Sequence, residues 1–137
     1  MSFTGTTVRF PAIIPLPTPP SSTVNPATGQ LVPTVLRGTA LKASAGVVVP
    51  VALPADRVIG VALSDSDSLN NLVPVYMGAA TLELNVTVGL TIAQFDLLYS
   101  NGDGTFTNVQ PGTNPAIAIA VNPSFGQSTV EAVYLNE

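Results

Sequence analysis

The side chains that could do chemistry in this chain are carboxylates and hydroxyls, because its 137 residues include no His, Cys or Trp. That composition excludes the usual general base near neutral pH, a thiol nucleophile and most transition-metal ligands. Two carboxylate pairs remain as candidates for acid–base work: Asp65 with Asp67, and Glu83 with Asp96. The first pair lies among Ser and Asn residues, which typically satisfy turn backbone. Glu83 is expected on the wet face of a strand. We predict no catalytic residues and no enzyme.

A second group of oxygen ligands lies further along the chain. Asn101, Asp103 and Thr105 superficially match the start of a calcium loop. An EF-hand also needs a bidentate Glu at its twelfth position, and that position here is Gly112. The chain has no Gly-rich phosphate loop that follows a strand and opens a helix. We therefore predict neither a metal nor a cofactor.

Three tyrosines, Tyr76, Tyr99 and Tyr134, each lie near the end of a strand-like segment. A phenol ring has an apolar body and a polar tip, which suits the edge of an interface. We predict that these tyrosines form a rim or interface set rather than a ligand cage.

The charge pattern bears on partners. The net charge is −4, and the four basic residues, Arg9, Arg37, Lys42 and Arg57, are scattered through the sequence. Phosphate binding needs clustered Lys and Arg, so no nucleic-acid partner is predicted. Every apolar run is interrupted well short of about 18 residues, so no membrane span is predicted. Charged residues are only 9% of the chain, and a surface with so few charges is typically covered by a partner.

The elements that must position these residues begin with a repeated unit. The runs RVIGVALSD (57–65) and PAIAIAVNP (115–123) are short, apolar on both alternating faces, and closed by polar residues or Pro. This pattern favours strands buried on both sides. Each run is followed by a polar connector and a second strand that ends near a Tyr, LVPVYMG (72–78) and STVEAVYL (128–135). The duplication predicts two similar halves that close on one core, as in a barrel or sandwich.

The remaining segments also favour strands. Residues 39–43 and 46–53 are strand candidates, and Pro50 restricts the second to an edge or a bulge. Residues 80–89 alternate, which predicts one buried face. That face comprises Leu82, Leu84, Val86 and Val88. Residues 95–108 predict a hairpin around two Gly-containing dipeptides. A single helical turn is expected at most at 91–95, so the fold class is all-β, a compact barrel-like or sandwich domain.

The first 35 residues differ in composition from residues 36–137, which form the predicted domain. Seven of the thirteen prolines fall in the first 33 residues, which predicts an extended arm with polyproline character. Apolar residues alternate along it and give one apolar stripe. That stripe either packs on its own domain or lies on a neighbouring subunit, as peptides do when they add to a sheet edge. We favour the second alternative, with partner-contacting residues Val8, Phe10, Ile13, Ile14 and Leu16.

Taken in order, several segments resemble a family of small phage head proteins, the capsid decoration or cement proteins. These segments are ALKASAGVVV, VIGVAL, VPVYMGAATLEL, IAQFDLLYSNGDGTFT, NPAIAIAV and VEAVYL. The resemblance covers residues 36–135. It implies a β-tulip-like domain, commonly a homotrimer, on the outer surface of the virion, where it bridges major capsid protein subunits.

Two further functions stay open beside the structural capsid protein. One is an adhesive or structural β-module of a phage tail or fibre with glycan-binding loops, against which the absence of Trp argues. The other is a carboxylate-dependent hydrolase that uses Asp65 and Asp67. The low charge, the Pro-rich arm and the missing catalytic side chains favour the capsid protein.

Overall fold

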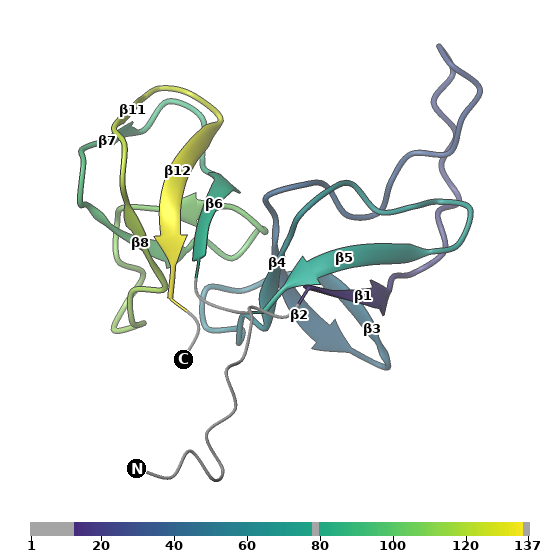
Figure 1. The fold of residues 1–137 in the computed structure, drawn as a ribbon, viewed down its shortest axis with the longest axis horizontal. Coiled ribbons are helices and arrows are strands. Elements are labelled where there is room, and N and C mark those ends of the chain that lie inside the picture. Colours follow the sequence, from purple (N-terminus) through teal and green to yellow (C-terminus); the bar gives the residue numbers. More distant parts are fainter. Residues whose placement is uncertain (1–12, 78–79, 136–137) are drawn as a thin grey trace, which may run out of the picture.

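The computed structural model describes residues 13–77 and 80–135, and all regular elements in these two ranges are β-strands (Figure 1). The all-β fold class is confirmed. The first range contains β1 (Ile13–Pro17), β2 (Ala40–Ser44), β3 (Val47–Pro50), β4 (Gly60–Ala62) and β5 (Leu72–Tyr76). The second contains β6 (Ala80–Asn85), β7 (Thr91–Ile92), β8 (Leu97–Ser100), β9 (Phe106–Thr107), β10 (Ala118–Ala120), β11 (Ser124–Phe125) and β12 (Thr129–Tyr134).

The strands form two five-stranded antiparallel sheets with the same connectivity. The first sheet has the order β1-β5-β4-β2-β3, and the second has the order β6-β12-β10-β8-β9. If the strands of each sheet are numbered along the chain, both orders are 1-5-4-2-3. The small sheet of β7 and β11 is added to the second half. Residues 13–77 (the first half) and 80–135 (the second half) therefore repeat one topology.

The repeated unit that the sequence indicates forms the centre of each sheet. β4 lies between β5 and β2, and β10 lies between β12 and β8. Val61 pairs with Tyr76 in the first half, and Ala118 pairs with Tyr134 in the second. Both central strands are only three residues long, shorter than the apolar runs that contain them. The predicted central strands are confirmed.

The second sheet curls until its two edges meet. Val86, directly after β6, forms a parallel bridge with Phe106 of β9, and β6 and β9 are the outer strands of the sheet. Phe106 is fully buried. One hydrophobic cluster joins both halves, because it contains Ala40, Val51 and Val61 of the first half beside side chains of the second. A smaller cluster lies within the first half alone.

Glycines let the two halves approach closely. Gly102, at φ +88°, lies so close to the first half that an added Cβ would be 2.5 Å from Cδ of Pro54. Gly104 has the same φ, and its carbonyl accepts a hydrogen bond from the backbone N–H of Ala40 at 2.9 Å. At the other side of the junction, Asn85 donates through Nδ2 to the carbonyl of Arg37 at 2.6 Å. The hairpin between β8 and β9 thus fastens the second half to the first.

Two strand predictions are confirmed in detail. The segment with Pro50 is an edge strand, β3, which ends at that proline. The hairpin predicted over 95–108 is formed by β8 and β9, and Gly102 and Gly104 supply the positive φ at its turn.

Two local predictions are wrong. Val88 is 72% exposed rather than buried, because the strand has ended at Asn85 and the chain turns at Gly89, whose φ is +93°. The possible helical turn at 91–95 is absent from the described residues, since Thr91 and Ile92 pair with β11 instead. In both places long-range pairing decides the local structure.

Candidate interaction surface and pocket

The first carboxylate pair shapes a turn. Asp67 accepts hydrogen bonds from the backbone N–H of Leu69 at 2.9 Å and from Asn70 Nδ2 at 2.8 Å. These bonds, the backbone N–H of Leu69 first, hold the pKa of Asp67 below its usual value. Asp65 accepts from the backbone N–H of Arg37 at 2.8 Å. Each carboxylate has its own backbone partner, as expected for side chains that satisfy turns.

The second pair is not assembled as a site. Glu83 forms an exposed ion pair with Arg37, with Oε2 2.5 Å from Nη2. Asp96 accepts hydrogen bonds from the backbone N–H of Ala93 at 2.9 Å and from Asn108 Nδ2 at 3.3 Å. An exposed ion pair contributes about 0–1 kcal/mol, so Glu83 has a surface role.

Asn101, Asp103 and Thr105, which match the start of a calcium loop, lie in the turn of the β8–β9 hairpin. Asp103 Oδ1 accepts from the backbone N–H of Thr105 at 3.0 Å, and Asn101 Nδ2 donates to Asp103 Oδ2 at 3.4 Å. The side chains bond to one another across the turn. Within residues 13–77 and 80–135, no three acidic side chains come together in a way that could hold a metal ion.

The predicted interface residues fall into three groups. Tyr76 and Tyr134 are buried, at 7% and 2% exposure, and Tyr99 is half-buried. Of the predicted arm residues, Ile13, Ile14 and Leu16 lie in β1, which pairs with β5 along its whole length. Val8 and Phe10 lie outside the described residues.

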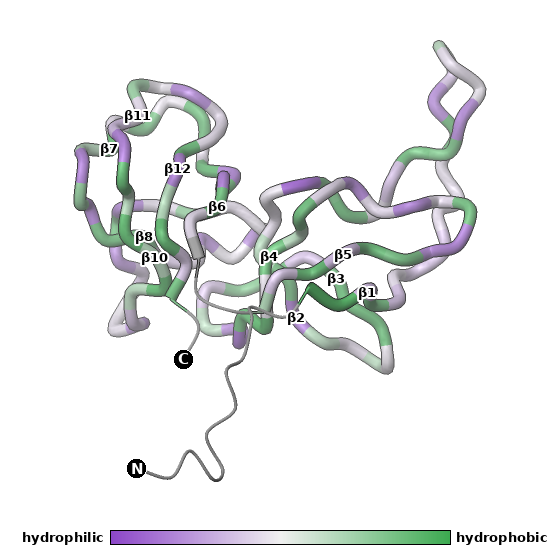
Figure 2. Tube along the Cα trace, in the orientation of Figure 1, coloured by the Kyte–Doolittle hydropathy of each residue, from purple (hydrophilic) through white to green (hydrophobic). Residues whose placement is uncertain are grey.

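The side chains of the edge strand β1 differ in burial. Leu16 packs against the cluster of the first half, whereas Ile13 and Ile14 are 58% and 39% exposed. Figure 2 shows that β1 is among the most apolar stretches of the chain. In the described residues β1 pairs only with β5, and it also lies close to β3 without forming a strand pair with it, so Ile13 and Ile14 are the apolar surface that β1 leaves exposed.

Large apolar side chains also lie exposed at two opposite ends of the molecule. At one end a loop projects between β1 and β2, held by a bridge between Val24 and Leu31 (Figure 1). Val24 is 52% exposed, and Leu69 on the adjacent β4–β5 connection is 89% exposed. At the other end, by β7 and β11, Phe95 and Phe125 are 70% and 73% exposed. We call these the loop end and the β7–β11 end.

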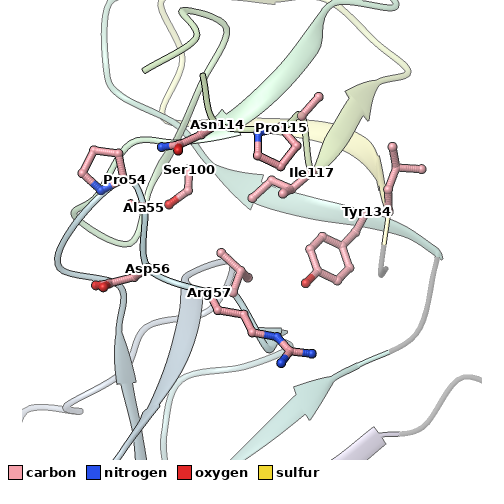
Figure 3. A pocket seen from close by; sticks show the side chains of 12 residues that line it. Pro54, Ala55, Asp56, Arg57, Ser100, Asn114, Pro115, Ile117 and Tyr134 are labelled. Atoms are coloured by element: carbon pink, nitrogen blue, oxygen red, sulfur yellow. The ribbon is translucent and has the colours of Figure 1, made fainter. Parts of the chain in front are cut away.

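A pocket lies where the two halves meet (Figure 3). Residues 54–58 line one wall, residues 114–117 line another, and Ser100, Tyr134 and Leu135 complete it. Its volume is about 210 Å³. The two walls are the segments that lead into β4 and β10, so the repeated units begin on opposite sides of one cavity.

The lining of the pocket includes one cation, Arg57, one carboxylate, Asp56, and two hydroxyl groups. Figure 3 shows the phenol oxygen of Tyr134 pointing toward the side chain of Arg57. Burial raises the pKa of Tyr134 to about 12, so its phenol stays protonated and can donate a hydrogen bond. Ser100 is 6% exposed, and its buried Oγ has no hydrogen-bond partner. Arg57 is exposed and forms no ion pair with the described residues.

A charged pair anchors the wall that holds Arg57. Asp56 accepts from Lys42 Nζ at 3.0 Å and from the backbone N–H groups of Ala52 and Leu53 at 3.0 and 2.9 Å. The Lys42 hydrogen bond, followed by those from Leu53 and Ala52, lowers the pKa of Asp56. Asp56 therefore forms its ion pair with Lys42 and not with the neighbouring Arg57.

Sequence reasoning did not find this pocket. Arg57 is the first residue of the first repeated unit, and Pro115 is the first residue of the second. Their equivalent positions in the repeat were a sequence feature that could have indicated that both line one pocket. The role of Ser100 depends on how the hairpin packs on Pro54, which no local pattern contains.

The fold and the pocket define an all-β protein with a duplicated five-stranded sheet and a pocket between its two halves. A search of protein-family models gave no match to the chain, and neither did a search of curated proteins. None of the described elements is a helix that could cross a membrane.

Proposed function

We propose that this chain is a structural capsid protein, a cement or decoration protein on the outer surface of a phage head. It bridges neighbouring subunits of the major capsid protein and acts as a homotrimer. Because it binds the assembled shell and not the dissociated subunits, it stabilises the shell by mass action. No chemical step is required.

The observation that carries this proposal is the exposure of large apolar side chains at opposite ends of one molecule. Phe95 and Phe125 are at the β7–β11 end, and Val24 and Leu69 are at the loop end. Isolated exposed apolar residues are ordinary, but large ones grouped in a chain with 9% charged residues typically mark contact with another protein. Two separate groups suit a protein that holds two neighbours at once.

The edge strand β1 supplies a third contact. Its exposed Ile13 and Ile14 give apolar surface that suits contact with a neighbouring subunit. The net charge of −4 suits the outside of a shell better than its DNA-lined interior, since acidic surfaces are repelled by DNA phosphates.

The experiment measures binding of the purified protein to empty phage heads that are assembled from the major capsid protein of the same phage. Removal of residues 1–20 would also remove β1 and the buried Thr18, so the deletion must stop at residue 12. We expect the full chain to bind to saturation and the deletion of residues 1–12 to bind at least tenfold more weakly. If the deletion variant occupies the heads as fully as the full chain does, the arm has no role in binding. No binding by the full chain would overturn the function.

A further inference from the structure

We infer that the pocket between the two halves is a binding site for a carboxylate group, held by Arg57 and Tyr134. This site is independent of the apolar ends on which the proposed function rests. It has not been assigned by any motif in the sequence, since no pattern brings residues 57, 100 and 134 together.

The donors determine the class of ligand. The guanidinium of Arg57 offers paired N–H donors that match the two oxygens of a carboxylate. The phenol of Tyr134 points toward that same side chain and adds a third donor (Figure 3). The nearest carboxylate along the chain, Asp56, is held by Lys42 and two backbone N–H groups. An incoming anion therefore meets a cation that the described residues leave without an ion pair.

The rest of the lining determines the size and shape of the ligand. The pocket has a volume of about 210 Å³. That volume suits an acidic side chain or a short carboxylic acid, and it is below the roughly 300–1,000 Å³ of drug-sized sites. Ala55, Pro115 and Ile117 give the walls apolar surface for an aliphatic stem.

A second polar position lies away from Arg57. Ser100 is more than nine-tenths buried, its Oγ has no partner, and the side chain lies between the Pro54–Ala55 segment and Asn114 (Figure 3). A buried hydroxyl without a partner costs about 1–3 kcal/mol. A peptide carbonyl that follows the carboxylate into the pocket and reaches this hydroxyl would give it the partner that it lacks. The arrangement accepts a Glu or Asp side chain presented by a protein, or a free small carboxylic acid.

The test is an NMR titration of the full, ¹⁵N-labelled chain with N-acetyl-glutamate N-methylamide. We expect saturable shifts confined to residues 54–58, 100, 114–117 and 134–135, with a Kd of about 1 mM for so small a ligand. The matched neutral probe, N-acetyl-glutamine N-methylamide, should bind at least tenfold more weakly. Equal binding of the two probes, or no saturable shift at about tenfold above that Kd, would overturn the inference.

Two variants locate the site. R57Q removes the cation from an exposed position, and Y134F removes only the hydroxyl. We expect affinity to fall about tenfold or more in R57Q and about threefold in Y134F. R37Q is the control, because Arg37 is also an exposed arginine but pairs with Glu83 elsewhere. A loss in R37Q equal to that in R57Q would show nonspecific attraction and contradict the assignment.

Propionate distinguishes the two sources of the carboxylate. A tenfold preference for the peptide-like probe assigns the pocket to an acidic side chain of a partner protein. Equal affinity for propionate assigns it to free small carboxylic acids. Neither result depends on capsid binding, so this site and the proposed function can fail separately.

Discussion

The two halves of this molecule share one strand order but differ in how they close. In the second half, the bridge between Val86 and Phe106 joins the outer strands, and Phe106 and Tyr134 fill the interior. The cluster confined to the first half contains only aliphatic side chains: Val35, Leu41, Val48, Ala62, Val73 and Val75. The outer strands of both sheets therefore come close together, but a strand bridge joins them only in the second half, since β1 and β3 lie near each other without pairing.

The first half also contributes side chains to the larger core, which it shares with the second half. Ala40, Val51 and Val61 belong to the cluster that includes Phe106 and the other buried residues of the second half. The first half also carries the long connection from β1 to β2, with its projecting loop, whereas β7 and β11 extend the second half. The comparison indicates that stability depends on the junction, where both halves contribute side chains to one core.

The largest expected effect comes from the residue that closes the second sheet. F106A should destabilise the protein by about 3–5 kcal/mol, because it removes a fully buried ring and leaves a cavity. Since the core is shared, melting should remain a single transition in which both halves lose structure together. Calorimetry of F106A checks this, with L41A as the matched change in the first half. Two separate melting transitions in either variant would contradict a single core that both halves share.

The junction itself is tested by a glycine. G102A should destabilise by about 1–3 kcal/mol from the left-handed φ alone, with a further cost from the clash with Pro54. G46A is the control, because Gly46 has nearly the same φ, +85°, and nothing within 4 Å of an added Cβ. Urea denaturation should show a larger loss in G102A. Equal losses would mean that the contact between hairpin and first half adds nothing.

A smaller effect concerns the charged anchor beside the pocket. The pKa of Asp56 is lowered in the folded state below its ordinary 3.8, mainly by the hydrogen bond from Lys42. A lowered folded pKa stabilises the protein above the unfolded pKa, and this contribution is lost as pH falls through the folded value. D56N should therefore be less stable than the unmodified chain above about pH 5, with the difference shrinking below about pH 4. A difference that stays constant down to pH 2 would contradict this.

Much of the fold could be predicted from short patterns in the sequence. The apolar runs around Val61 and Ile119 identify the central strands, Pro50 marks an edge, and the Gly residues of the hairpin fix its turn. In each case a few neighbouring residues determine the backbone geometry or the burial of the segment. Val88 shows the limit, because its exposure depends on where pairing with β12 ends.

The site could not be predicted in the same way. The pocket exists because Gly102 lets the hairpin lie against Pro54, which brings Ser100 beside the segment that leads into β4. The prediction of a rim is wrong for Tyr76 and Tyr134, which are buried, and Tyr134 lines the pocket between the halves.

The claim that this chain bridges two neighbours is tested most directly by the temperature at which empty heads come apart. One double variant, F95S/F125S, alters the β7–β11 end, and another, V24S/L69S, alters the loop end; all four residues are exposed, so folding should be unaffected. The account predicts that the unmodified chain raises the disruption temperature. It predicts that each double variant still binds through its intact end but gives little or none of that rise. Full stabilisation by both variants would contradict it.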